Sequence, residues 1–321
     1  MRNLSDNWPD ARITWVIGKT EATLMAGIDG VEFIIFDKRR GLSAVLDVRS
    51  RLKGRHFDAA LCMHASARVN ALYAFVASPR KIGFDRERAR DLQWLFTNDT
   101  IGATHGKHAL EAMLMFARKI GAEETPLRWD VPVSEEHAEF ARKFRETGRP
   151  LVLISPCSSL RSRNYRNWDA NKFVAVIEHA VHQHDARVVI TGGRSDVEYD
   201  YGQQLAGGND AVTNLTARTD LKQLYALIAE ADVVVCPDSG PAHMATAAGT
   251  PVVGLYATSN PGRTGPYLSA DYTVNRYPDA AKRFLGKTVE ELRWGQRVRS
   301  PDAMNLIKIG EVCDKIDKIL R

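Results

Sequence analysis

The chain has 321 residues, 44% hydrophobic and 26% charged, a composition typical of a soluble globular protein with room for two domains of roughly 150 residues. Lysine and arginine number 44 against 39 aspartates and glutamates, so the net charge is +5, which suits an anionic substrate or an anionic membrane surface as well as a generally solvated exterior. The absence of a basic stripe interleaved with aromatics argues against nucleic-acid binding, and no run approaches the ~20 apolar residues of a membrane span.

The N-terminal half alternates short apolar runs with helical patterns. Its first residues, "MRNLSDNWPDARITW", lack the apolar core of a signal peptide. Strands are predicted at Arg12–Gly18, Val31–Asp37, Asp58–His64 and Lys81–Phe84, with helices at 41–54, 66–78 and His108–Ala122. Such alternation predicts a parallel sheet with helices on both faces.

A proline-containing connection at 123–136 leads into a helix that we expect to stop at Gly148, since glycine is the usual residue after a helix C-terminus. We therefore place the domain boundary there, giving one Rossmann-like domain at 1–148 and a second at 149–321. Strands in the second domain are predicted at Leu151–Pro156, 186–193, 212–215, 231–237 and 251–257. The final amphipathic helix, 303–320, could pack on either domain. Two doubly wound domains enclose a cleft, and ligands bind beyond the carboxyl ends of the strands.

Polar residues follow the first strand of this second series. Ser158 and Ser159 come directly after it, and Arg166 lies a few residues further on. Small hydroxyl residues after a strand leave backbone N–H groups free for a phosphate, and arginine matches phosphate oxygens with a fork of donors. A basic, solvated loop is an equally good interpretation of this segment alone. After the next strand, Asp196 is more simply a helix cap than a sugar ligand.

The motif "CPDSGPAH" follows the fourth strand. Asp238 or Ser239 would cap a helix that begins near Gly240, and the N–H groups at that end favour an anion. His243 lies one turn into this helix and could donate to a phosphate, although a satisfied core histidine is the simpler alternative. Asp238 would repel phosphate, so we expect it to accept hydrogen bonds from neutral hydroxyls or to orient His243. After the last strand, "TSNPGRTGPY" adds hydroxyls and Arg263, and four strand ends together indicate a phosphorylated ligand such as a nucleotide sugar.

The chain has four cysteines: Cys62, Cys157, Cys236 and Cys313. They show no CxxC pairing, so we expect buried free thiols in a reducing compartment. His179, His182 and His184 cluster late in a predicted helix. Because no acidic or cysteine partner lies at ligand spacing, we expect no metal site there.

Several segments resemble glycosyltransferase family 9, the ADP-heptose lipopolysaccharide heptosyltransferases. They are "PDSGPAHMATAAGTPVVGLYATSNPGRTGPY", "NLTARTDLKQLYALIAEAD", and "ISPCSS" followed by "RNW". In the first half, "ITWVIGKTEA", "FDAALCMHASARVNAL" and "KIGFDRERARDLQWLFTN" are similar to the heptosyltransferase I branch. The resemblance covers nearly the whole chain.

The resemblance implies a GT-B fold, with two Rossmann-like doubly wound domains. It implies that the second domain binds ADP-L-glycero-D-manno-heptose and that the first receives Kdo-lipid A, the lipopolysaccharide acceptor. Transfer would invert the anomeric centre without a metal or another cofactor. We expect a cytoplasmic protein that can associate peripherally with the inner membrane.

Individual residues carry over by position. Asp238, Ser239, Gly240 and His243 match the donor-binding motif, and Ser158 and Ser159 match its hydroxyl pair at the phosphates. Arg166 falls where the family usually has lysine, and the resemblance assigns it to the leaving diphosphate. Asp196 would lie near the heptose or ribose, and Thr219 beside the adenine.

The chain departs from the family at its N-terminus. The family opens with a strand and a loop of the type "SxxGD", whose aspartate is the expected general base. This chain begins after that loop, so the base is expected before Met1, and the missing strand should expose an apolar groove. We favour a start assigned too late over a truncated, impaired enzyme, and we do not substitute Asp6 or Asp10. The alternatives are a protein that binds ADP-heptose or ADP without transfer, and a sugar-nucleotide epimerase; an NAD enzyme is disfavoured because no GxGxxG follows a predicted strand.

Overall fold

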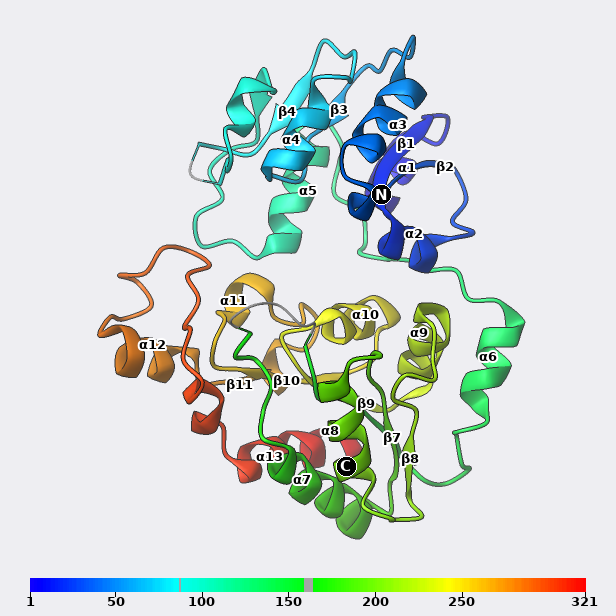
Figure 1. Ribbon diagram of the computed structural model, residues 1–321, viewed down its shortest axis with the longest axis vertical. Helices are drawn as coiled ribbons and strands as arrows, with labels where there is room; N and C mark the ends of the chain where they lie inside the picture. Colours follow the sequence, from blue (N-terminus) through cyan, green and yellow to red (C-terminus); the bar gives the residue numbers. More distant parts are fainter. Residues whose placement is uncertain (87, 159–163) are drawn as a thin grey trace. The chain divides into compact units, whose positions relative to one another are not determined.

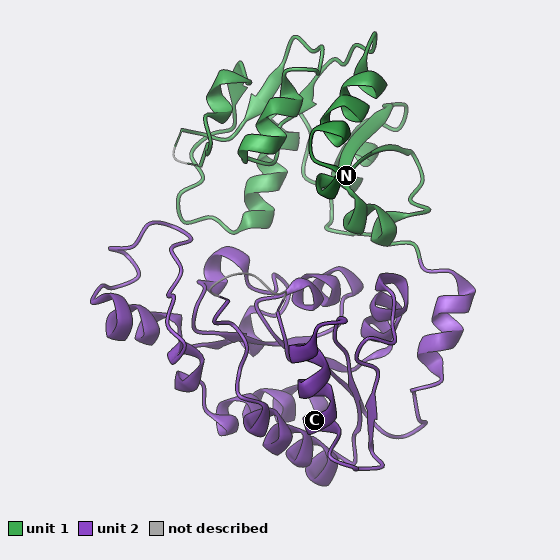
Figure 2. Cartoon of the chain, viewed as in Figure 1, with its two compact units in different colours: residues 1–132 green, residues 133–321 purple. Residues whose placement is uncertain are grey.

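The protein's structure is a computed structural model that describes residues 1–86, 88–158 and 164–321 (Figure 1). The chain divides into two units, 1–132 and 133–321 (Figure 2). The division therefore precedes the position near Gly148 that the sequence suggested. The reason is helix α6 (Glu135–Arg142), which packs against α9 (Leu221–Glu230) of the second unit.

Unit 1 is built from short elements. Its helices and 3₁₀ turns are α1 (Arg2–Asn7), α2 (Lys19–Met25), η1 (Lys38–Arg40), α3 (Leu42–Leu52), α4 (Ala67–Tyr73), η2 (Gln93–Leu95) and α5 (Ala109–Lys119). Its strands are β1 (Ile13–Gly18), β2 (Val31–Phe36), β3 (Ala60–Leu61), β4 (Lys81–Gly83) and β5 (Asp99–Thr100). The strands form two parallel sheets, β1–β2 and β3–β4–β5.

Each sheet of unit 1 has its own small apolar core. Ile34, Val48, Leu52 and Leu72 pack beside β1–β2, whereas the core beside β3–β4–β5 contains Ile82, Phe84, Ile101 and Phe116. β1 is only half-buried at every position but one. This contrasts with the fully buried strands at the centre of unit 2.

Unit 2 alternates strands and helices. Its further helices and 3₁₀ turns are α7 (Ala170–His184), α8 (Asp196–Ala206), α10 (Gly240–Ala248), α11 (Pro261–Thr264), η3 (Ala270–Tyr272), α12 (Tyr277–Leu285), η4 (Ala303–Leu306) and α13 (Ile309–Leu320). Its strands are β6 (Leu151–Ile154), β7 (Arg187–Ile190), β8 (Val212–Asn214), β9 (Val233–Pro237), β10 (Val252–Tyr256) and β11 (Val274–Asn275).

The sheet of unit 2 is parallel, with the order β8–β7–β6–β9–β10–β11. This order is the 3-2-1-4-5-6 arrangement of a Rossmann fold, in which ligands bind where the strand order reverses. The reversal falls between β6 and β9, where Val152 pairs with Val233. Residues that follow these two strands are therefore placed at the expected ligand position.

Helices cover both faces of this sheet. α7 packs against α8 and α13, whereas α9 packs against α10 and α6. The terminal helix α13 also contacts β9, β10 and β11, so it belongs to unit 2. One core cluster is built around the fully buried Trp168 and Phe173, whose rings meet edge to face at 5.1 Å.

The helix that was expected to stop at Gly148 is shorter than predicted. α6 ends at Arg142 rather than at Gly148, which instead takes φ of 82° in the turn before β6. Positive φ favours glycine there because a side chain would be strained. All four cysteines are buried and free, as expected.

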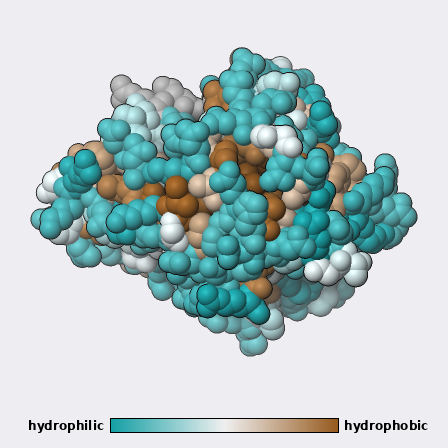
Figure 3. Space-filling view, turned by 90° about the horizontal axis from the view of Figure 1, so that it is seen from below, coloured by the Kyte–Doolittle hydropathy of each residue, from teal (hydrophilic) through white to brown (hydrophobic). Residues whose placement is uncertain are grey.

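The surface is largely hydrophilic on the face that Figure 3 displays, with apolar side chains gathered in short patches. None of the helices in the described residues is long and apolar enough to cross a bilayer.

Candidate functional site

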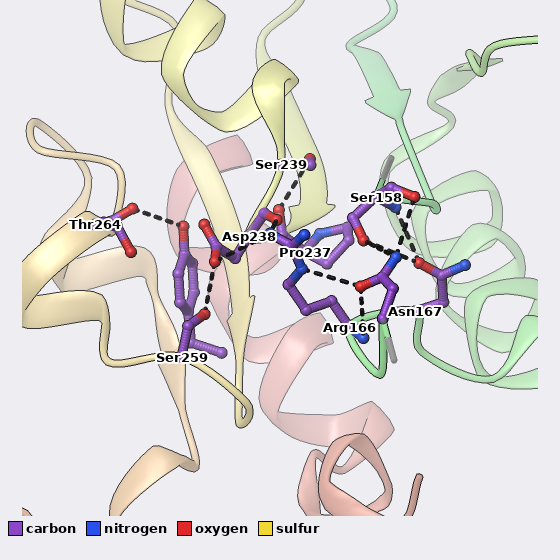
Figure 4. A network of polar contacts seen from close by, with 10 residues as sticks. Ser158, Arg166, Asn167, Pro237, Asp238, Ser239, Ser259 and Thr264 are labelled. Atoms are coloured by element: carbon purple, nitrogen blue, oxygen red, sulfur yellow. Dashed lines mark hydrogen bonds and ion pairs between the residues drawn. The ribbon is translucent and has the colours of Figure 1, made fainter. Parts of the chain in front are cut away.

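A network of polar side chains lies where the strand order of unit 2 reverses (Figure 4). We call it the strand-end network, and it consists of Ser158, Asn164, Arg166, Asn167, Asp238, Ser239 and Ser259. These residues follow β6, β9 and β10. Parallel strands end at one edge of the sheet, so their following loops meet there.

Arg166 and Asp238 form the centre of the network. Arg166 Nη1 donates to the main-chain oxygen of Asp238 at 2.8 Å and lies 3.3 Å from its Oδ2. The two side chains are only 12% and 8% exposed. Ser259 Oγ also donates to Asp238 Oδ2, at 2.8 Å. The carboxylate of Asp238 is thus partnered by a cation and a neutral hydroxyl, which reduces the repulsion that it would exert on a bound phosphate.

The loop after β6 fixes the guanidinium of Arg166. Asn164 Oδ1 accepts from Arg166 Nε at 3.0 Å, and Asn164 Nδ2 donates to Ser158 Oγ at 2.6 Å. Within the described parts of the chain, Arg166 Nη2 has no hydrogen-bond partner and remains available to a ligand. The sequence interpretation did not single out Asn164 or Asn167; their position on either side of Arg166 in "RNYRNW" was the available signal.

Ser158 has a different local role from the one its position suggested. Its N–H donates to Asn167 Oδ1 at 2.9 Å, so this backbone group is not free for a phosphate. The hydroxyl oxygen of Ser158 accepts a hydrogen bond from Asn164 of the same loop. Ser158 is therefore placed to shape the loop that carries Arg166. Ser159, the other hydroxyl residue of the expected pair, lies outside the described residues.

The motif after β9 begins helix α10. Ser239 occupies the N-cap position, but its hydroxyl donates to the main-chain oxygen of Pro237 at 3.0 Å and does not cap the helix. The first-turn N–H groups of α10 therefore lack a side-chain cap among the described residues. Uncapped N–H groups and the positive end of the helix dipole favour an anion.

Gly240 and His243 lie in the first turn of α10. A Cβ added to Gly240 would have no atom of the described residues within 4 Å, so the glycine borders open space. His243 is an exposed residue of this turn. Desolvation by the surrounding protein lowers its pKa, against an opposing effect of the negative Asp238. The neutral ring that this favours at pH 7 still offers one N–H donor.

Asp196 and Thr219 lie on neighbouring loops. Asp196 is the first residue of α8, but Ser195 is the cap, because its hydroxyl accepts from the N–H of Glu198. Asp196 is exposed at this helix start. Thr219 is half-buried and directly precedes Asp220, which caps α9. Both residues lie after neighbouring strands, β7 and β8, of the same parallel sheet.

Solved structures share this architecture. A glycosyl transferase family 9 structure from Veillonella parvula matches with a TM-score of 0.76 and 20% identity, covering 99% of this chain and 91% of that one. E. coli heptosyltransferase WaaC with ADP matches with a TM-score of 0.73 and 16% identity, over 99% and 93% of the two chains. The fold is that of the GT-B glycosyltransferases.

Sequence comparison identifies the family. The model described as glycosyltransferase family 9 (heptosyltransferase) matches residues 45–292. The lipopolysaccharide core heptosyltransferase OpsX of Haemophilus influenzae is 34% identical over 320 residues, which are 99% of this chain and 91% of that protein. The chain belongs to glycosyltransferase family 9 and is a glycosyltransferase, which confirms the resemblance drawn from the sequence and disfavours the epimerase alternative.

Proposed function

We propose that the protein transfers heptose from ADP-L-glycero-D-manno-heptose to Kdo of the lipopolysaccharide inner core. The proposal rests on the position of Arg166. Its guanidinium contacts Asp238 beside the uncapped start of α10, at the place where the strand order of the sheet reverses. This arrangement is suited to a diphosphate. The names of two relatives support the choice of ligands: one acts on the lipopolysaccharide core, and another was solved with ADP-2-deoxy-2-fluoro heptose.

The proposed reaction is a single displacement. The acceptor hydroxyl attacks the anomeric carbon of the heptose, the bond from that carbon to the diphosphate oxygen breaks, and the configuration inverts. Negative charge grows on the leaving ADP. The guanidinium of Arg166 and the N–H groups of α10 would stabilise it, so the protein can supply the charge that a divalent cation provides in other enzymes. A carboxylate would take the proton of the acceptor hydroxyl.

The remaining site residues have supporting roles in this proposal. Ser158 would hold the loop of Arg166 in place, and His243 would donate to a phosphate oxygen. Asp196 would accept from a sugar hydroxyl, and Thr219 would lie beside the adenine. Unit 1 would receive the acceptor, Kdo-lipid A.

Replacement of Gly240 by alanine tests the diphosphate position. Its φ is not positive and the added methyl group meets open space, so the free energy of unfolding should change by no more than about 1 kcal/mol. If the diphosphate approaches this backbone closely, the methyl group should weaken ADP binding about 10- to 100-fold. Calorimetric titration with ADP measures the effect.

Gly310→Ala is the matched control, because Gly310 also lies early in a helix and borders open space. It should leave ADP affinity unchanged. Equal ADP affinities for Gly240→Ala and the native protein would place the diphosphate elsewhere.

The function itself is tested by ligand selectivity and turnover together. ADP should bind and UDP should bind much more weakly, and ADP-heptose with a Kdo-lipid acceptor should yield a heptosylated product. ADP binding without any transfer would favour the alternative of a non-catalytic binding protein. Failure to bind ADP would contradict both.

We also propose that unit 1 associates with an anionic membrane surface through residues 38–53. This segment holds six basic residues and one acidic residue, so its net charge of +5 equals that of the whole chain. Leu42 and Leu46, one turn apart on α3, are 73% and 52% exposed. The same helix packs Val48 and Leu52 inward. Exposed leucines beside clustered cations suit the interface of an anionic bilayer.

The membrane proposal predicts a loss of vesicle binding when the cations are removed. Each lysine or arginine near an anionic surface contributes about 1 kcal/mol, so Arg39→Ser with Arg49→Ser should weaken binding to phosphatidylglycerol vesicles about 25-fold. Leu42→Ser with Leu46→Ser should weaken it as well, since less apolar surface enters the interface. Co-sedimentation measures both effects.

The control replaces Leu268, which is 55% exposed in unit 2, with serine and should change nothing. Equal binding to vesicles of phosphatidylcholine alone would contradict an electrostatic contribution. Undiminished binding of both double variants would place the contact on another surface.

A further inference from the structure

Two histidines of α7 converge on one carboxylate of α13, on the face of the unit 2 sheet that these helices share. His179 Nε2 and His184 Nε2 each lie 2.7 Å from Asp317 Oδ1. Asp317 is 138 and 133 residues away along the chain, and it is the acidic partner that spacing within the helix did not provide. His182, on the same helix, is exposed and lies outside this group.

The geometry points to a zinc site formed by His179, His184 and Asp317. The three candidate ligand atoms all lie within 4.8 Å of one another. The two imidazole rings have centroids 6.0 Å apart and planes inclined by 66°, and the Nε2 atom of each ring contacts the same carboxylate oxygen. In a tetrahedral zinc site, bonds of 2.0–2.2 Å put ligand atoms about 3.3 Å apart. Each contact would therefore lengthen by about 0.6 Å as the cation enters.

The chemistry of the donor set favours zinc over magnesium or calcium. Two imidazoles and one carboxylate suit borderline cations, whereas Mg²⁺ and Ca²⁺ prefer oxygen ligands throughout. Three protein ligands leave a fourth position for water. The metal would take the place of the hydrogen at each Nε2. A neutral imidazole can carry that hydrogen on Nδ1 instead, so both rings can ligate the metal without a change in charge.

The surroundings also favour a cation. His184 is the last residue of α7, and Asp185 ends the helix with φ of 51°. The free carbonyl groups at a helix C-terminus form its negative end. The side chains of His179, His184 and Asp317 are 25%, 14% and 24% exposed, so the site is partly sheltered and still accessible to an ion.

The proposed metal would join α7 to the terminal helix α13 and would not take part in heptosyl transfer. α7 runs from the carboxyl end of β6 to the amino end of β7. Its last turn is therefore at the opposite edge of the sheet from Arg166 and Asp238. The site would act on stability, since an ion that binds only the folded state shifts the unfolding equilibrium.

The test uses the full chain without an affinity tag, stripped of metal with a chelator. Equilibrium dialysis should find one Zn²⁺ per chain with micromolar or tighter affinity, and Co²⁺ should give the visible absorption of a tetrahedral complex. At a free Zn²⁺ concentration 100-fold above Kd, the melting temperature of unit 2 should rise by about 5 °C or more. Zn²⁺ should leave ADP affinity unchanged.

Three variants test whether Zn²⁺ binds at these side chains and not elsewhere on the chain. His179→Gln with His184→Gln, and separately Asp317→Asn, should each lower Zn²⁺ affinity at least about 100-fold, because each removes ligands. Asp317→Asn retains an oxygen that can accept hydrogen bonds, so it keeps the shape of the cluster. His182→Gln should bind Zn²⁺ as the native protein does. A native chain that binds no Zn²⁺ at 100-fold molar excess over about 1 μM protein, or double-variant binding equal to native, would show that the cluster is a hydrogen-bonded link only.

Discussion

Replacing Arg166 with alanine is expected to lower the rate of heptosyl transfer by about 10²- to 10³-fold and to weaken ADP binding. The change removes the cation placed beside the start of α10, and with it Nη2, the donor that has no partner in the described residues. A transfer assay and a calorimetric ADP titration measure the two effects. Arg166→Lys should recover part of both, since lysine retains the charge without the planar fork.

The Arg166 change should also lower the free energy of unfolding, and this loss can be separated from the loss of transfer activity. Asp238 is buried, and without Arg166 its carboxylate keeps, among the described residues, only the hydrogen bond from Ser259. An uncompensated buried charge costs on the order of 3 kcal/mol. Adding Asp238→Asn should restore much of the free energy of unfolding while transfer stays slow. If Arg166→Ala retains native transfer rates in a folded protein, the leaving-group role is wrong.

Replacing Trp168 with alanine is expected to reduce the free energy of unfolding by about 3–5 kcal/mol. The indole is 0% exposed and packs edge to face on Phe173. Its Nε1–H donates to the main-chain oxygen of Ile307 at 3.4 Å. The residue also ends the loop that carries Arg166, so ADP binding should weaken too. Urea unfolding measures the stability change.

Trp94→Ala provides the control for the Trp168 change, because Trp94 is 59% exposed. It should alter the free energy of unfolding by no more than about 0.5 kcal/mol. Trp168→Phe should lie between the two, since it retains an aromatic ring but loses volume and the N–H donor. Similar unfolding curves for the alanine variants at 168 and 94 would contradict the packing described for unit 2.

Much of the fold could be predicted from apolar runs. Those at β6, β9 and β10 are continuous and bounded by proline, glycine or polar residues, so their strands lie within a few residues of the predicted ones. The two-residue strands β5 and β11 were not predicted, because Asp99–Thr100 and Val274–Asn275 contain no such run. The place of α6 in unit 2 depends on its packing against α9, which local pattern does not encode.

The candidate site could be predicted only in part, for a physical reason. The positions of Arg166 and Asp238 after their strands follow from the Rossmann pattern, but their 2.8 Å contact spans 72 residues and depends on which strands are neighbours. The use of Ser158 inside its own loop depends on Asn164 and Asn167. The approach of Asp317 to His179 likewise requires the packing of α13 on α7.

Transfer of heptose from an ADP-heptose donor by this chain can be followed on the acceptor itself. The full chain is incubated with ADP-L-glycero-D-manno-heptose and Kdo-lipid A, and the lipid is examined by mass spectrometry. We predict a gain of one heptosyl unit per acceptor, with an equal amount of ADP released, and a much slower gain with Arg166→Ala. An unchanged acceptor mass under conditions in which a known heptosyltransferase completes the reaction would contradict heptosyl transfer by this chain.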